Sequence, residues 1–176
     1  MKPKSIPCAD VDNYLARFRP TEGRALIVGS NTHGIKSPRQ KLYPDAIGMD
    51  AIDGHNVDLV HDFEEPLDET FSHIDCCSVM EHCQRPWLMA TNMENALESG
   101  GTILISVPFA WRLHDYPGDY WRLTASALDI LFPSIQWIDK KYLSNGFLWE
   151  RPQSLLSEDK VGFERTEVVA FGIKKD

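Results

Sequence analysis

The feature that most constrains the fold is a short apolar run that ends at a glycine-containing turn and is followed by a second apolar run ending in an acid. Residues 25–28 read Ala-Leu-Ile-Val and lead into Gly29, and residues 46–49 read Ala-Ile-Gly-Met and lead into Asp50. A strand that stops at a glycine turn lets a ligand approach the backbone. An acid about 20 residues further on is placed to accept hydrogen bonds from ribose hydroxyls. The pattern predicts an open α/β sheet that binds a cofactor containing adenosine.

Apolar segments with strand-like and helix-like spacing alternate along the rest of the chain, which is typical of α/β architecture. No helix is evident between the last two expected strands, so the last strand is expected to run antiparallel to its predecessor. The spacing therefore predicts a mostly parallel, seven-stranded sheet with the last strand antiparallel and helices on both faces. Strands are expected at 25–28, 46–49, 57–61, 74–79, 102–107, 135–138 and 166–173, and helices at 9–18, 37–44, 64–71, 86–98 and 124–132.

The length of the chain suits one domain. A chain of 176 residues can bury a full core, and its hydrophobic fraction of 43% is ordinary for a globular protein. We expect a single domain over 1–176, with an N-terminal helix and lead-in at 1–23 and a cofactor-binding core at 25–132. Residues 133–176 are expected to supply the terminal strands, joined by a long surface loop at 145–162.

Charge and hydropathy argue against several classes of partner. The net charge of −8 disfavours broad binding to nucleic acid, which depends on neutralising phosphates. No apolar run approaches the roughly 20 residues that span a membrane, and residues 1–7 have no apolar core behind them to form a secretory signal. A cytoplasmic protein with no membrane partner is therefore expected. The small basic group of Lys36, Arg39 and Lys41 is expected to be a solvated face.

The four cysteines predict neither a disulfide framework nor a metal site. Cys76 and Cys77 are adjacent in an expected strand, so they point to opposite faces and cannot chelate one ion together. Cys8 and Cys83 complete the set, and no CxxC pair or zinc spacing is present. We expect small buried side chains in a reducing compartment, and no metal is predicted.

Five motifs follow one another along the chain. They are Leu-Ile-Val-Gly-Ser-Asn at 26–31, Ile-Gly-Met-Asp at 47–50, Val-His-Asp at 60–62, Asp-Cys-Cys-Ser-Val-Met-Glu-His at 75–82, and a stretch at 95–108 that contains Gly100-Gly101. The Met-Glu-His and Gly-Gly elements at this spacing are more specific than any single motif. Together the motifs resemble the class I S-adenosylmethionine-dependent methyltransferases, in particular their type 11-like members. The resemblance covers about residues 25–132 and implies a Rossmann-like fold and S-adenosylmethionine as the cofactor.

The resemblance assigns roles around the cofactor. It implies that the methionine part lies against the turn, that Asp50 accepts from the ribose hydroxyls, and that Asp62 with Phe63 faces the adenine. It also implies that the end of the fourth strand lines the floor near the reactive sulfonium. The implied cofactor-binding residues are Gly29, Ser30, Asn31, Asp50, Asp62, Phe63, Ser78 and Val79.

The segment after the fifth expected strand is dense in aromatic and charged residues, and related methyltransferases carry a similar His, Pro, Asp-Tyr-Trp-Arg stretch there. A lid and acceptor-binding wall is expected, because loops at strand ends carry function more often than cores do. His114 is the candidate base, since histidine titrates near neutral pH. Arg112 or Arg122 is expected to hold an anionic acceptor. The alternative for Arg122 is a structural pair with Asp119, one helical turn away. The expected acceptor-binding residues are Glu81, His82, Trp111, Arg112, Tyr116 and Tyr120.

The sequence also departs from the family pattern. Ile27 stands where many members have an acid two residues before the first glycine, and Asn31 stands where a glycine is usual. Asparagine tolerates a left-handed backbone, so the turn can survive. The predicted function is methyl transfer to a small-molecule acceptor. The alternatives are a non-catalytic, cofactor-binding homologue and an NAD-dependent oxidoreductase, which Gly29, Gly34 and Asp50 fit loosely without the middle glycine.

Overall fold

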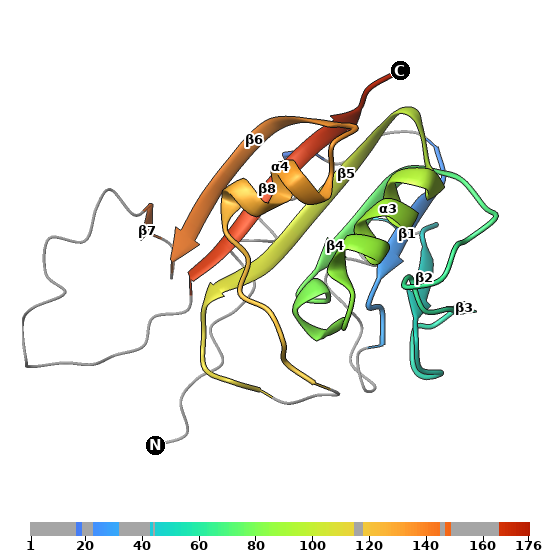
Figure 1. The fold of residues 1–176 in the computed structure, drawn as a ribbon. Coiled ribbons are helices and arrows are strands. Elements are labelled where there is room, and N and C mark those ends of the chain that lie inside the picture. Colours follow the sequence, from blue (N-terminus) through green and yellow to red (C-terminus); the bar gives the residue numbers. More distant parts are fainter. Residues whose placement is uncertain are drawn as a thin grey trace, which may run out of the picture.

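A computed structural model describes residues 17–18, 23–31, 43, 45–114, 118–144, 147–148 and 166–176. Within this part of the chain an eight-stranded sheet has the order β3-β2-β1-β4-β5-β8-β6-β7 (Figure 1). The strands are β1 (Ala25–Val28), β2 (Ile47–Asp50), β3 (Leu59–Val60), β4 (Phe71–Cys77), β5 (Leu97–Ala110), β6 (Ile135–Ser144), β7 (Phe147–Leu148) and β8 (Thr166–Lys174).

The sheet is parallel from β3 to β5 and becomes antiparallel at β8. β1 pairs parallel with both β2 and β4, and β4 pairs parallel with β5. β8 inserts antiparallel between β5 and β6, which confirms the predicted direction of the last strand. The seven expected strands are all present, and the two-residue β7 adds an eighth inside the expected loop at 145–162, most of which lies outside the described residues.

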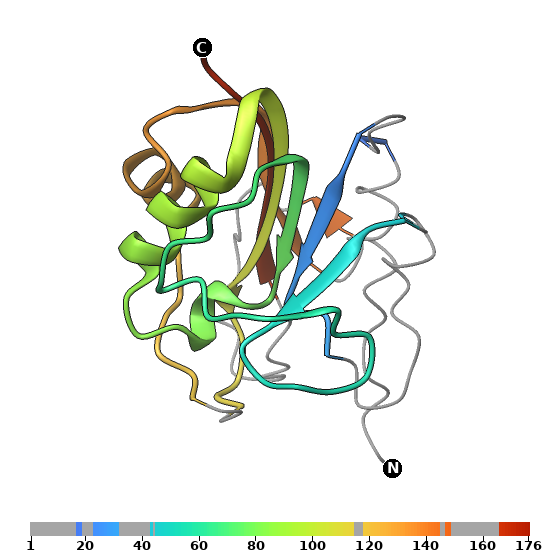
Figure 2. The same ribbon diagram turned by 90° about the vertical axis from the view of Figure 1, so that its right-hand side faces the viewer.

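Two described helices, α3 (Pro86–Ala96) and α4 (Ala125–Leu131), cover one face of the sheet. Figure 2 shows both on the same side of β4 and β5. The Thr124 side chain accepts a hydrogen bond from Ala127 N at 3.1 Å, so it caps α4. The helices expected at 9–18 and 37–44, which the prediction places on the other face, lie outside the described residues apart from isolated positions.

The core follows the alternation of side chains along β1. Leu26 and Val28 point into the large cluster that also holds the apolar residues of α3 and α4. Ala25 and Ile27 point the other way and pack with Tyr43, while Phe18 stacks on Phe171 at 4.3 Å between ring centroids. Both faces of the central strands are therefore covered, as a continuously apolar strand requires.

Three local predictions were wrong. The short helix expected at 64–71 is a turn, in which Glu65 N donates to Asp62 O at 2.9 Å, and β4 begins at Phe71. The helix expected to reach residue 98 ends at Ala96, because Leu97 is already extended and pairs with Phe71. Gly100-Gly101, which the sequence pattern predicts as the end of this helix, consequently lies within β5. Strand pairing, which is a tertiary effect, decided the last two cases.

Among the described residues, no helix combines the length and the apolar character needed to cross a membrane.

Candidate functional site

A pocket of about 560 Å³ opens where β1, β2, β3 and β4 end, and we call it the strand-end pocket. Open parallel sheets bind ligands outside the carboxyl ends of their strands, so this is the expected position of a ligand. Polar and apolar side chains share its wall. The lining residues are Val28, Gly29, Asn31, Met49, Asp50, Ala51, Ile52, His61, Asp62, Phe63, Glu64, Ser78, Val79, His82, Cys83, Gln84, Arg85, Met89 and Tyr120.

Gly29 forms the turn at the end of β1. Its φ of 71° lies in the left-handed region, and a Cβ at this position would lie 2.3 Å from Val79 Cγ2. Gly29 N and the following Ser30 N both donate to Met49 O, at 2.8 and 3.1 Å. The turn therefore needs glycine for its conformation and for its close approach to Val79, and it is hydrogen-bonded to β2.

Asp50 holds the tip of β2 beside this turn. Its Oδ2 accepts from Asn31 N at 3.1 Å, and its Oδ1 accepts from Ile52 N at 3.1 Å. A carboxylate oxygen has two lone pairs, so each oxygen can accept a second hydrogen bond from a ligand. The acid is thus oriented by backbone groups on both sides while it lines the pocket.

Asp62 and Phe63 form the next part of the wall, after β3. Asp62 Oδ1 accepts from Glu64 N at 2.9 Å, and the ring of Phe63 is buried and meets His61 edge-on at 5.9 Å. Phe63 O accepts from Asn92 Nδ2 at 2.9 Å, which ties this turn to α3. The turn offers an apolar ring beside a carboxylate, a combination suited to a flat heterocycle that carries an amine.

Ser78 and Val79 follow β4 and form the floor. Ser78 has a φ of 55°, which is uncommon for a residue with a side chain, and its N–H donates to Ser106 O at 2.8 Å. Backbone held in a sparsely populated region tends to occur at functional sites. The chain then enters the single-turn helix η1 (Met80–His82), which carries a second group of polar side chains.

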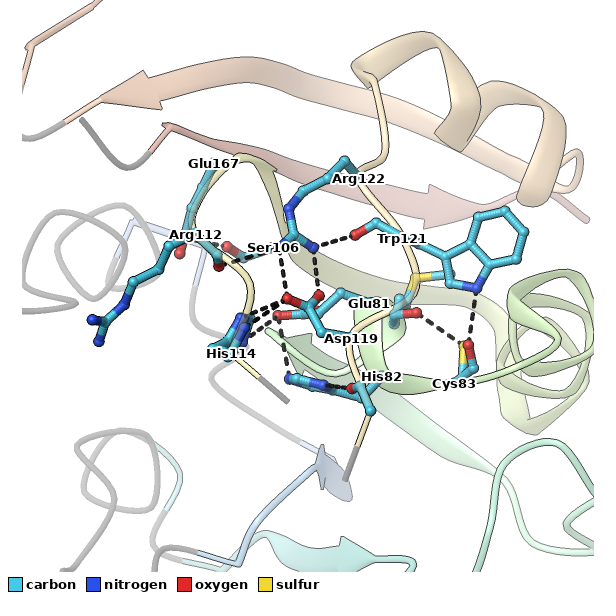
Figure 3. A network of polar contacts seen from close by, with 12 residues as sticks. Glu81, His82, Cys83, Ser106, Arg112, His114, Asp119, Trp121, Arg122 and Glu167 are labelled. Carbon is cyan, nitrogen blue, oxygen red and sulfur yellow. Dashed lines mark hydrogen bonds and ion pairs between the residues drawn. The ribbon is translucent and has the colours of Figure 1, made fainter. Parts of the chain in front are cut away.

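The second group joins η1 to the segment that follows β5 (Figure 3), and we call Glu81, His82 and His114 the Glu81 cluster. Glu81 is 1% exposed, and its Oε1 lies 3.7 Å from His82 Nε2 and 4.0 Å from His114 Nε2. The two imidazoles meet edge-on at 4.8 Å between centroids. His82 Nδ1 is hydrogen-bonded to Gly118 O, and His114 Nδ1 lies 3.0 Å from Asp119 Oδ2.

Asp119 links this cluster to Arg122. Arg122 donates to both Asp119 oxygens, at 2.5 and 2.7 Å, and His114 N donates to Oδ2 at 3.0 Å. The guanidinium of Arg122, together with the His114 N–H, holds the pKa of the Asp119 carboxyl well below its usual range. Arg122 also donates to Trp121 O and to Arg112 O. The structure thus contains the Asp119–Arg122 pair that the spacing offered as an alternative to anion binding.

Glu64 was not predicted as a site residue, but it holds Gln84 and Arg85 in place at the edge of the pocket. Its carboxylate accepts from Gln84 N at 2.6 Å and from both Arg85 N and Arg85 Nε, at 3.1 and 2.6 Å. Burial opposes the charge of Glu64, but these hydrogen bonds outweigh that effect and lower its pKa. The sequence does show Arg85 directly before Pro86, where α3 begins. Its spacing gives no indication that Glu64 is the partner of Arg85.

The structure brings most of the expected site residues together. Nine of them line the strand-end pocket: Gly29, Asn31, Asp50, Asp62, Phe63, Ser78, Val79, His82 and Tyr120. Ser30 and Glu81 are both buried. These two residues and Trp111, Arg112 and His114 are not among the lining residues, and Tyr116 lies outside the described part of the chain. Met49, His61, Glu64, Arg85 and Met89 line the pocket without having been predicted.

Solved structures share this fold at low sequence identity. A putative methyltransferase from Bacillus halodurans C-125 is 12% identical and superimposes with a TM-score of 0.72, covering 95% of this chain and 100% of that one. The N-methyltransferase NodS from Bradyrhizobium japonicum WM9, in complex with S-adenosylhomocysteine, is 13% identical with a TM-score of 0.64, covering 96% and 87%.

A third structure contains an acceptor as well as the spent cofactor. It is the 1,6-didemethyltoxoflavin-N1-methyltransferase of Burkholderia thailandensis, with bound 1,6-didemethyltoxoflavin and S-adenosylhomocysteine. It is 13% identical with a TM-score of 0.67, and the match covers 95% of this chain and 77% of that one. The chain therefore has the Rossmann-like fold found in these methyltransferases.

No protein-family model matches the sequence, and no curated protein matches it.

Proposed function

We propose that this chain is an S-adenosylmethionine-dependent methyltransferase that acts on a small-molecule acceptor. The observation that carries the proposal is the position of Asp50, fixed by two backbone N–H groups at the rim of the strand-end pocket and beside the left-handed turn at Gly29. The fold shared with methyltransferases that bind S-adenosylhomocysteine supports it.

The proposed cofactor position follows the order of the strand ends. The methionine part would lie against residues 29–31, including the buried Ser30, and Asp50 would accept from the two ribose hydroxyls. Asp62 and Phe63 would contact the adenine, the carboxylate accepting from the amine and the ring packing on the base. Ser78 and Val79 would then lie below the sulfonium. The pocket volume of about 560 Å³ falls within the range of about 300–1,000 Å³ usual for ligand sites.

Methyl transfer from a sulfonium asks mainly that the acceptor be held in line and away from water, so positioning is the main source of rate. Tyr120 lines the pocket, and Trp111 and Arg112 belong to the same segment, so we propose that this segment bounds the acceptor, with Tyr116 as a further member. An OH or NH acceptor also loses a proton. With Nδ1 facing Asp119, His114 has Nε2 available as the proton acceptor.

The proposal also covers the domain organisation and the cellular location of the protein. We propose one domain over 1–176 that works in the cytoplasm, where its cysteines stay reduced. Cys76 and Cys77 are buried in β4, and the Cys83 thiol donates to Met80 O. Burial raises the pKa of Cys83 to about 12, so its thiolate is scarce and it is not the nucleophile of the site.

Calorimetric titration with S-adenosylmethionine, S-adenosylhomocysteine and NAD⁺ tests the proposal. We expect the first two to bind and NAD⁺ not to bind. Asp50→Ala should weaken S-adenosylhomocysteine binding by about 1–3 kcal/mol, roughly 5- to 150-fold, because it removes hydrogen bonds to a charged group. The exposed Asp53, in the following loop, supplies a matched control, and Asp53→Ala should leave the affinity unchanged.

Three results would count against the proposed function or the proposed role of Asp50. Binding of NAD⁺ without S-adenosylmethionine would favour an oxidoreductase. An unchanged dissociation constant in folded Asp50→Ala would refute the contact between Asp50 and the ribose. Cofactor binding with no turnover across a broad panel of acceptors would instead favour a non-catalytic homologue.

A further inference from the structure

The Glu81 cluster has the composition and spacing of a metal site. One carboxylate oxygen of Glu81 and one nitrogen each of His82 and His114 all lie within 4.8 Å of one another. The separations from Glu81 Oε1 to the two Nε2 atoms, 3.7 and 4.0 Å, are longer than hydrogen bonds. Three groups that surround one point at this spacing leave room for an ion between them.

Each imidazole is also oriented as a metal ligand is. His82 Nδ1 is hydrogen-bonded to the backbone oxygen of Gly118, and His114 Nδ1 lies 3.0 Å from Asp119 Oδ2, although without the geometry of a hydrogen bond. Metal-bound histidines almost always direct their second ring nitrogen to a carboxylate or a backbone carbonyl, which fixes the ring and the tautomer. Both Nε2 atoms are thereby left to face Glu81, as Figure 3 shows.

We propose that Glu81, His82 and His114 bind a divalent transition-metal ion at the wall of the strand-end pocket. Ligand atoms about 2.0–2.2 Å from a tetrahedral Zn²⁺ lie about 3.3–3.6 Å apart. The two separations from Glu81 would therefore contract by less than about 1 Å, and the third, which is at most 4.8 Å, by up to about 1.5 Å. Two imidazoles and one carboxylate suit Zn²⁺, Co²⁺ or Fe²⁺, whereas Mg²⁺ and Ca²⁺ prefer oxygen ligands alone. No metal was predicted from the sequence, because the cysteines have no zinc spacing. His114 is distant from Glu81 along the chain, so their proximity is visible only in the fold.

The position of the ion suggests what it would do, and this step rests on the proposed function. Three protein ligands leave at least one coordination position for water or for an oxygen or nitrogen of the acceptor. His82 lines the pocket, so that position would be next to the bound ligand. Coordination would occupy Nε2 of His114, so His114 would no longer take the proton. The ion would instead lower the pKa of a coordinated acceptor OH or NH, whose proton would pass to water.

Metal binding can be measured without cofactor or acceptor. The protein, free of any histidine tag and treated with chelator, is titrated with Zn²⁺ by calorimetry and with Co²⁺ by visible absorption, whose d–d bands report imidazole coordination. We expect one ion per chain at neutral pH. His82→Gln and His114→Gln should each weaken binding at least about tenfold. His55→Gln, at an exposed histidine in the loop after β2, is the matched control and should bind normally.

The pH dependence supplies a second readout. Binding should weaken in acid, because protons compete with the ion for the ligand atoms. Circular dichroism checks that each variant is folded. Glu81→Gln removes the third ligand, but this side chain is buried and the variant can fail to fold. The two histidine variants then decide the result, because the side chains of His82 and His114 are partly exposed.

The outcomes separate this inference from the proposed function. No stoichiometric ion in folded wild-type protein, or binding unchanged in both His82→Gln and His114→Gln, would overturn the metal site even if S-adenosylhomocysteine binds. Stoichiometric Zn²⁺ lost in these two variants would support the site even if S-adenosylhomocysteine does not bind, in which case the proposed function alone would fail.

Discussion

The strand-end pocket and the Glu81 cluster are neighbours, but they are positioned in different ways. The turn at Gly29 and the acid at Asp50 are held by backbone hydrogen bonds between adjacent strands. The Glu81 cluster is held by side chains from two segments far apart in the sequence, joined through Asp119 and Arg122. We infer that the first depends on strand geometry, and that the second depends on a few charged contacts that single substitutions can remove.

The largest effect should come from Asp119→Ala. The Asp119 side chain is fully buried between Arg122 and His114, so its loss leaves the Arg122 charge uncompensated. Breaking such a pair costs about 3 kcal/mol of unfolding free energy. Urea unfolding followed by circular dichroism measures this loss. Asp129→Ala removes an exposed partner of Lys140 and should cost under about 1 kcal/mol. Equal costs for the two variants would contradict the difference between the regions.

A second prediction separates the acid sensitivity of the core from that of the Glu81 cluster. Burial lowers the pKa of His73 to about 4, although the neighbouring Asp75 raises it, and its Nδ1 is hydrogen-bonded to Thr102 Oγ1 at 2.8 Å. The folded protein therefore favours neutral His73, so its contribution is complete above about pH 6.5, the unfolded pKa, and is lost as the pH falls toward 4.

This linkage should remove about 2 kcal/mol of unfolding free energy between about pH 7.5 and pH 5. Urea unfolding at the two pH values checks it, with His73→Asn compared with wild type. The variant should lose about 2 kcal/mol less than wild type over the same interval. A His114→Gln variant that flattens the profile as much as His73→Asn would place the acid sensitivity in the Glu81 cluster instead.

The smallest expected loss of stability comes from substituting a glycine. Gly29 and Gly100 have the same φ of 71°, so they can be compared directly. A Cβ at Gly29 would lie 2.3 Å from Val79 Cγ2, whereas a Cβ at Gly100 would have nothing within 4 Å. The left-handed backbone alone costs about 1–2 kcal/mol on substitution by alanine, so Gly100→Ala should lose about this much. Gly29→Ala should lose more, because Val79 must also shift to admit the new Cβ.

Only Gly29→Ala should also displace the floor of the pocket, and we expect it to weaken S-adenosylhomocysteine binding at least about tenfold, which is about 1.4 kcal/mol. Gly100→Ala should bind normally. Calorimetric titration of the two variants decides the matter, and equal affinities would show that the turn does not form the cofactor site.

The same contrast explains how much the sequence revealed. The positions of Gly29 and Asp50 at the pocket were inferable, because a strand end and the residue after it are fixed by local backbone pattern. The Asp119–Arg122 pair was inferable because its members are one helical turn apart. The contact of His114 with Asp119 and the burial of Glu81 could not be inferred from the sequence. Both arise because the segment that follows β5 folds back against η1.

The helix end at Ala96 follows the same rule. Local pattern favoured continuation to residue 98, but Leu97 pairs with Phe71 of β4, a residue that only the folded sheet brings near it. Glu64 likewise meets Arg85 across a turn whose path the spacing does not specify. Pairings over long sequence distances are the part of this molecule that the sequence pattern did not predict.

A crystal structure of the protein with S-adenosylhomocysteine would test the central claim most directly. We predict that the ribose hydroxyls donate to Asp50, that the adenine lies between Asp62 and Phe63, and that the sulfur lies above Ser78. A ligand bound elsewhere, or a ribose that makes no contact with Asp50, would contradict the assignment of the strand-end pocket as the cofactor site.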